Sequence, residues 1–155
     1  MQKRKGWMSH MEAAVLYEKK GKTAYITLHR PDKSNSINLE VRRTLSQLWS
    51  TVDADPEVCS IILTGGEKVF STGFDMTELA EFRKKEPMAE LPCTGSDVFG
   101  ASVSKPVIAA ISGYCLGGGF FLTMAAADLR IASHTARFGM PEVKIGITPA
   151  FGIPP

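Results

Sequence analysis

The sequence has few cysteines and no long apolar run. Cys59, Cys93 and Cys115 are the only three cysteines in 155 residues. An odd number of cysteines without CxxC or Cys/His spacing argues against both a disulfide framework and a zinc site. No apolar run approaches the roughly 18 residues needed to cross a bilayer. We therefore expect a soluble, cytoplasmic protein with free thiols, no metal and no membrane partner.

Charge is unevenly spread along the chain, although the net charge is only +2. Residues 1–33 hold eight Lys and Arg against three acids, whereas residues 34–155 hold ten against thirteen. The basic end lacks the aromatic interleaving and the basic stripe of a nucleic-acid binder. The pattern leaves open an anionic partner other than a nucleic acid, and for Lys3 to Lys5 a solvated tail is the better interpretation.

Length and composition predict one globular domain. A chain of 155 residues leaves no room for a second domain of ordinary size. Hydrophobic residues at 44% and charged residues at 22% are globular averages. Residues 1–12 show no periodicity, so we expect a flexible or appended tail there and the folded domain at residues 13–155.

Local patterns predict an α/β domain, in which strands and helices alternate. A hairpin with one buried face is expected at residues 15–28, because apolar and polar residues alternate over 24–28. Asn38 is a good N-cap for an amphipathic helix that ends near Pro56. A strand buried on both faces is expected at residues 59–63, a second buried strand at residues 107–111 and a further strand at residues 129–132. Asp75 and Glu78 resemble a capping box that opens one more helix, and another helix is expected over residues 120–127.

Two segments are expected to be loops with exposed backbone N–H groups. Residues 69–76 and the glycine-rich residues 113–119 each follow a predicted strand and lead into a predicted helix. Loops at the carboxyl ends of parallel strands meet at one edge of a sheet, where α/β proteins bind ligands. Two converging N–H groups can stabilise an enolate or a tetrahedral oxyanion. The glycine turn matches neither the dinucleotide nor the Walker pattern.

Four segments, in order, resemble the N-terminal part of the crotonase (enoyl-CoA hydratase/isomerase) superfamily. They are residues 30–36 (RPDKSNS), 70–76 (FSTGFDM), 105–119 (KPVIAAISGYCLGGG) and 138–146 (FGMPEVKIG). The resemblance implies a spiral of ββα units, an acyl-coenzyme A thioester as substrate with no separate cofactor, and a homo-oligomer, a trimer or hexamer. It also implies C-terminal helices that this sequence lacks.

The resemblance also implies functional positions. The amides of Phe74 and Gly118 match the family's two oxyanion donors, and Glu142 matches a catalytic glutamate. The wall around the coenzyme A and acyl groups is expected at these substrate-binding positions: Lys33, Ser34, Ser36, Ser71, Gly73, Asp75, Met76, Tyr114, Gly117 and Pro141. Lys33 is the expected phosphate contact.

Family hydratases use a second glutamate, which this sequence does not have. It should stand at Phe121, or at Leu122 if the helix register is counted from Asp128. Hydration divides its work between two positioned groups, whereas a single carboxylate suits removal and return of one proton. We therefore expect double-bond isomerisation. The open alternatives are hydration, decarboxylation, thioester hydrolysis and a non-catalytic coenzyme A-binding or assembly subunit; a serine peptidase is disfavoured because no Ser-His-Asp set falls at the strand ends.

Overall fold

The computed structural model describes residues 13–87, 95 and 97–146, over which strands and helices recur in the order strand, strand, helix. The elements are β1 (Val15–Lys20), β2 (Thr23–Leu28), η1 (Pro31–Lys33), α1 (Leu39–Ala54), β3 (Ser60–Thr64), β4 (Val69–Ser71), α2 (Met76–Lys85), β5 (Val107–Ile111), β6 (Tyr114–Leu116), α3 (Gly118–Ala126), β7 (Leu129–Ala132), β8 (Arg137–Gly139) and η2 (Pro141–Ile145). Four ββα units follow one another, the last with a 3₁₀-helix in place of its α-helix. The expected α/β fold of ββα units is confirmed.

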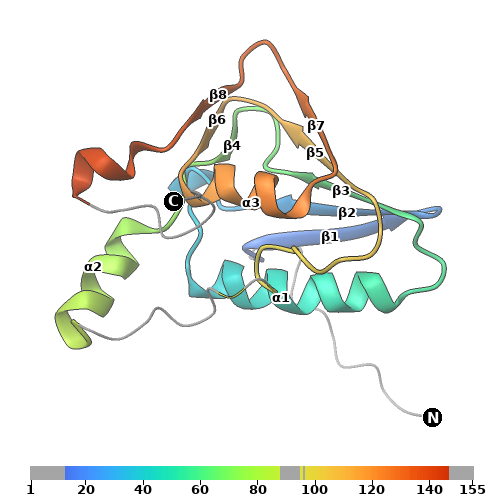
Figure 1. Ribbon diagram of the computed structural model, residues 1–155, viewed down its shortest axis with the longest axis horizontal. Helices are drawn as coiled ribbons and strands as arrows, with labels where there is room; N and C mark the ends of the chain where they lie inside the picture. Colours follow the sequence, from blue (N-terminus) through green and yellow to red (C-terminus); the bar gives the residue numbers. More distant parts are fainter. Residues whose placement is uncertain (1–12, 88–94, 96, 147–155) are drawn as a thin grey trace.

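The strands of these units separate into two sheets. The larger sheet has the order β1-β2-β3-β5-β7, and the smaller has the order β4-β6-β8. The β1–β2 hairpin is antiparallel, and the other pairs are parallel. In Figure 1, α1 runs alongside the larger sheet while α2 projects away from both sheets. α3 packs against β4 and β6 of the smaller sheet.

Burial explains why the N-terminal elements form where local pattern predicts them. Ala24, Ile26 and Leu28 of β2 are at most 2% exposed, which confirms the buried face of the hairpin. The apolar stripe of α1 packs into the same core. The Asn38 side chain accepts a hydrogen bond from the amide of Val41, which confirms the predicted N-cap.

Several local expectations need correction. β3 alternates between fully buried and half-buried residues, so it is not buried on both faces. The strand expected at residues 129–132 is present as β7, at the edge of the larger sheet, and all of its residues are exposed. Residues 69–76 and 113–119 are not loops throughout, since they contain the three-residue strands β4 and β6. These short strands pair with each other rather than with the larger sheet.

The two cysteines that the structure describes, Cys59 and Cys115, are free thiols, as expected. Cys93 and the expected tail at residues 1–12 lie outside the described residues. Within the described ranges, no helix combines the length and the apolar character that a bilayer crossing requires.

Candidate functional site

The segment after β4 and the turn after β6 are in backbone contact. A Cβ added to Gly73 would lie 3.1 Å from the nitrogen of Gly118 and 3.1 Å from the carbonyl oxygen of Leu116. A Cβ added to Gly118 would lie 3.6 Å from the nitrogen of Phe74. The two segments therefore meet as their sequence predicts. They meet at the end of the smaller sheet, however, rather than at the edge of the main one.

The direction of the Phe74 amide follows from its pairing with Ile37. The Ile37 amide donates to the Gly73 carbonyl at 2.8 Å, and the Asp75 amide donates to the Ile37 carbonyl at 3.1 Å. In a trans peptide the C=O and N–H groups point in opposite directions. The Phe74 N–H therefore points away from Ile37, and it donates to no acceptor in the described part of the chain.

The Gly118 amide is the first of α3. The first four N–H groups of a helix have no partner within the helix, and together they form its positive end. For Gly118 the described residues provide no acceptor elsewhere either. Gly117 precedes it with φ +50°, a left-handed conformation that suits glycine. Two backbone donors thus belong to segments in contact, and neither is satisfied by the described protein.

Glu142 stands in η2, directly after Pro141, and reaches back to the glycine turn. A Cβ on Gly117 would collide with its Oε1 atom, so the absence of a side chain there lets the carboxylate approach the backbone. The other carboxylate oxygen, Oε2, is buried and has no hydrogen-bond partner in the described structure. Buried polar atoms are nearly always paired, so an unpaired one marks a site where another group is expected.

α3 carries no carboxylate at the position where the resemblance implies a second catalytic glutamate. The Phe121 ring packs edge-to-face on Phe99, with centroids 4.8 Å apart, and Leu122 is fully buried. Phe120 packs on Phe138 at 5.6 Å. The residues at the expected position are therefore packed apolar side chains in either register.

Asn35 is a site residue whose role sequence reasoning missed. Its side-chain amide donates to the carbonyls of Gly65, Val69 and Phe70 at 2.7, 2.8 and 3.2 Å, and its Oδ1 accepts from the Arg30 amide at 2.8 Å. The residue is buried with φ +52°, a conformation that asparagine tolerates better than most residues. The αL tendency of Asn inside a polar loop was the available signal.

Arg30, Ser36 and Asp75 form a second tie between these loops. The Arg30 guanidinium donates to Asp75 at 3.0 Å and to the Ser36 hydroxyl at 3.0 Å. Burial alone would raise the pKa of Asp75, but hydrogen bonds from Arg30, Ser36 and the Glu78 amide outweigh it and hold this pKa below its ordinary value. Asp75 caps α2 as predicted, but Glu78 does not complete a capping box, because its carboxylate bonds the Leu39 amide instead.

Ser71 and Gly73 also form hydrogen bonds within the protein. The Ser71 hydroxyl donates to the Asn35 carbonyl at 2.8 Å and accepts from the Gly73 amide at 3.1 Å. Ser71 is fully buried, and its side chain lies where a Cβ on Gly119 would stand. The side chains of Ser36, Ser71 and Asp75 all have hydrogen-bond partners within the protein. Their contact with a ligand remains a prediction.

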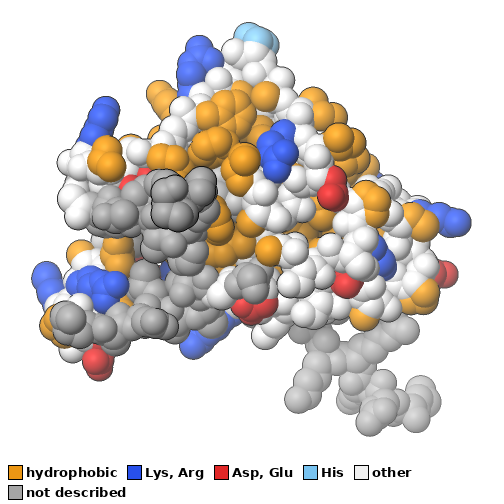
Figure 2. Space-filling view, viewed as in Figure 1, with side chains coloured by type: hydrophobic (Ala, Val, Ile, Leu, Met, Phe, Trp, Pro, Cys, Tyr) orange, Lys and Arg blue, Asp and Glu red, His pale blue; other side chains and the backbone are white. Residues whose placement is uncertain are grey.

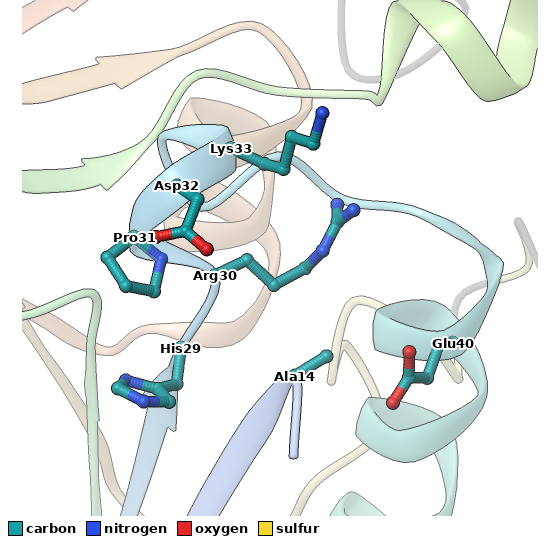
Figure 3. A pocket seen from close by; sticks show the side chains of 7 residues that line it. All are labelled: Ala14, His29, Arg30, Pro31, Asp32, Lys33 and Glu40. Atoms are coloured by element: carbon teal, nitrogen blue, oxygen red, sulfur yellow. The ribbon is translucent and has the colours of Figure 1, made fainter. Parts of the chain in front are cut away.

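Four other predicted contacts lie on the surface. Lys33 and Ser34 are exposed in and after η1, and Met76 and Tyr114 are 47% and 55% exposed. Figure 3 shows Arg30 and Lys33 projecting from one loop while Glu40 comes from α1. A hollow of about 490 Å³ is lined by Ala14, His29, Arg30, Pro31, Asp32, Lys33 and Glu40. Its lining carries side chains of both charges. Arg30 is already paired with Asp75, so Lys33 remains the predicted phosphate contact.

Comparison with known proteins identifies the class to which this arrangement belongs. Residues 18–155 match the enoyl-CoA hydratase/isomerase family. The chain is 43% identical over 141 residues to a short-chain-enoyl-CoA hydratase of Clostridium acetobutylicum, an alignment that covers 89% of this chain and 53% of the relative. It is 38% identical over 141 residues to a crotonyl-CoA hydratase of Syntrophomonas wolfei, covering 89% of this chain and 54% of that one.

Solved structures agree. An enoyl-CoA hydratase/carnithine racemase from Magnetospirillum magneticum superposes with a TM-score of 0.77 at 33% identity, covering 89% of this chain and 53% of that one. The chain therefore belongs to the enoyl-CoA hydratase/isomerase family, and the predicted resemblance is confirmed. It spans about half the length of the curated relatives it matches. Those relatives are named hydratases, which gives no support to the preference for isomerisation.

Proposed function

We propose that the chain binds an acyl-coenzyme A thioester and stabilises its enolate between the amides of Phe74 and Gly118, with Glu142 as the base. The observation that supports it most strongly is the meeting of two unsatisfied backbone donors beside a carboxylate whose Oε2 is buried and unpaired. Preorganised N–H groups in such a site favour the charge that develops on a thioester oxygen.

The proposed chemistry needs one carboxylate. Glu142 removes an α-proton of a 3-enoyl thioester, and the electron pair of that C–H bond moves toward the thioester oxygen held by the two amides. Glu142 then returns the proton at C4, which shifts the double bond and leaves the carboxylate free again. Phe121 favours this isomerisation, because no second acid or base stands on α3 to share the work of adding water.

Hydration is the second candidate, and it is favoured by the names of the curated relatives. Both reactions use the same bound thioester, so the substrate class is shared. The oligomeric state also remains a proposal: Leu129 and Ile131 of the edge strand β7 are 62% and 64% exposed. In Figure 2 apolar side chains gather over the part of the molecule where Figure 1 places β6, β7 and β8, as expected of a surface that another chain covers.

Exchange of α-protons with deuterated water tests the shared first step. Butyryl-CoA bound at saturation should lose its α-protons to solvent, as followed by proton NMR, because exchange needs only enolate formation. Glu142→Gln keeps the shape of the side chain and removes the base, so exchange should fall by about 10² to 10⁴ while affinity changes little. Absence of exchange in the wild-type chain would reduce the proposal to ligand binding.

Phe121→Glu separates the two candidate reactions. If the missing carboxylate is what prevents hydration, the variant should hydrate crotonyl-CoA while the wild-type chain does not. Hydration of crotonyl-CoA by the wild-type chain itself would favour the second candidate and contradict the single-carboxylate mechanism.

A further inference from the structure

Arg42 is the one charged residue among the largest fully buried side chains of the described structure. It lies in α1 and is 2% exposed. A guanidinium is almost never buried at this level without a partner. The Arg42 Nη2 atom donates to Glu78 Oε1 at 2.9 Å, and the other oxygen of Glu78 accepts from the Leu39 amide at 2.7 Å. Glu78 thereby holds Arg42 at the N-terminal end of α1.

Two further contacts of Arg42 lead to Phe74. Its Cζ atom lies 5.6 Å from the centroid of the Phe74 ring, within the range of a cation–π contact. Its Nη1 atom also lies 3.5 Å from the carbonyl oxygen of Ile37. That carbonyl accepts the hydrogen bond from the Asp75 amide. Arg42 therefore touches both the side chain of Phe74 and the backbone that holds the following peptide.

The Phe74 ring also lies against the first residue of α3. A Cβ on Gly118 would stand 3.1 and 3.2 Å from its Cδ2 and Cε2 atoms. The ring therefore contacts Arg42 and also the residue that supplies the second proposed donor. A displacement of the ring would alter the spacing between the amides of Phe74 and Gly118.

We infer that Arg42 is a positioning residue, which acts through the Phe74 ring to set the spacing of these two amides. The inference rests on the proposed function for its catalytic consequence and on the contacts above for its structural one. Both donors must lie about 3 Å from the same thioester oxygen to share its charge. A misplacement of about 1 Å in such a site can cost about 10² in rate.

Arg42→Met tests the inference, with Arg43→Met as the matched control. Arg43 is the next residue of α1 and is exposed, so the control makes the same substitution without removing the buried guanidinium. At saturating butyryl-CoA, Arg42→Met should lower α-proton exchange by about 10- to 100-fold, with ligand affinity within about threefold of wild type. The control should exchange within about twofold of wild type.

Amide spectra of the ligand-free protein give a readout that does not depend on activity. Movement of the Phe74 ring changes its ring current at nearby nuclei, so the proton–nitrogen resonances of Phe74 and Gly118 should shift in Arg42→Met and stay in place in Arg43→Met. Phe74→Leu, which removes the ring and keeps the amide, should lower exchange to a similar degree. In the double variant with Arg42→Met the two losses should not add.

The outcomes separate this inference from the proposed function. If the wild-type chain exchanges no α-proton, the proposed function fails, and the amide spectra still decide whether Arg42 positions Phe74. Unshifted Phe74 and Gly118 resonances in a folded Arg42→Met chain would overturn the inference. An Arg42→Met chain that exchanges α-protons at the wild-type rate despite shifted resonances would overturn it as well. If Arg42→Met does not fold, Arg42→Met with Glu78→Gln replaces it in both measurements, because that pair removes the charge of Glu78 together with its cationic partner.

Discussion

The two sheets take strands from the same ββα units but are built differently. In the larger sheet, Ile26, Ile61, Leu63 and Ile111 are at most 2% exposed and pair in regular register. In the smaller sheet the strands have three residues each, and the β4–β6 pairing shifts register between Val69 and Ser71. The proposed donors follow the strands of this smaller sheet. The larger sheet therefore contributes more side chains to the core than the smaller one, which places the backbone groups of the site.

The largest effect on stability is expected from a truncation in the larger sheet. Leu63→Ala should lower the free energy of unfolding by about 2 to 5 kcal/mol, because Leu63 is fully buried and its loss leaves a cavity. Ile131→Ala removes a similar side chain from β7, but it should change stability by no more than about 0.5 kcal/mol, since Ile131 is 64% exposed. Denaturant titration measures both.

Below the unfolding transition, the Leu63→Ala chain should still exchange α-protons at the wild-type rate per folded molecule. A loss of exchange in the folded variant would show that the two sheets do not divide stability from the site in this way.

The next effect concerns the segment after β4. Gly73 has φ +93° and Gly66 has φ +90°, so alanine at either position should cost about 1 to 3 kcal/mol of stability through backbone strain. A Cβ at Gly73 would also press on the Gly118 nitrogen, whereas one at Gly66 would meet nothing within 4 Å. Gly73→Ala should therefore lower α-proton exchange at saturating ligand, and Gly66→Ala should leave it unchanged.

Equal exchange in these two glycine variants would argue against the close approach of the segments as a requirement of the site. Thermal unfolding of both proteins provides the control, because backbone strain is expected to destabilise each of them.

The larger sheet was more predictable from sequence than the smaller one. Local sequence patterns predict β2, by the alternation in residues 24–28, and the neighbouring helix α1, by the cap at Asn38 before an amphipathic stripe. β4 and β6 have only three residues each, too few for a periodic pattern, and they pair across more than forty positions of the chain. Their strand character depends on that pairing rather than on local propensity.

The candidate site was predicted in part for a similar reason. The glycine turn and the Pro-Glu segment are visible as motifs, and the structure brings Glu142 to Gly117. Arg42 gives no such signal, because it follows a buried Val41 on α1 and its partner Glu78 stands 36 residues later. From sequence alone, a charged residue whose partner is distant in the chain is interpreted as a solvated side chain, because only the folded structure shows the pair.

A smaller effect is expected from the pair that ties the two loops. Asp75→Asn keeps an oxygen to cap α2 but loses the ion pair with Arg30, so it should cost about 1 to 2 kcal/mol at pH 7. The pKa of Asp75 is held below 3.8 in the folded protein. Its contribution is therefore present above pH 3.8 and lost as the pH falls through the lowered pKa of the folded state.

The difference between the unfolding free energies of the two proteins, measured from pH 7 down to pH 3, should begin to narrow below pH 3.8. A constant difference across this range would mean that the ionised carboxylate contributes nothing beyond the cap.

The smallest change compares the two cysteines that the structure describes, one next to the larger sheet and one within the smaller sheet. Cys59 precedes β3 of the larger sheet and is exposed, whereas Cys115 is buried in β6 of the smaller one. Burial raises the pKa of the Cys115 thiol to about 12, against a smaller lowering by its hydrogen bond with Thr123. Since the thiolate is the reactive form, only about 10⁻⁴ of Cys115 is ionised at pH 8, and access is blocked as well. Iodoacetamide should therefore label Cys59 at least about 100-fold faster in the folded protein, as measured by peptide mass spectrometry.

In guanidinium chloride the two rates should become similar, because unfolding removes the burial that raises the pKa of Cys115. Equal labelling of the folded protein would mean that β6 opens readily, and a site built on the end of this strand would then lack the fixed donor spacing that enolate stabilisation requires.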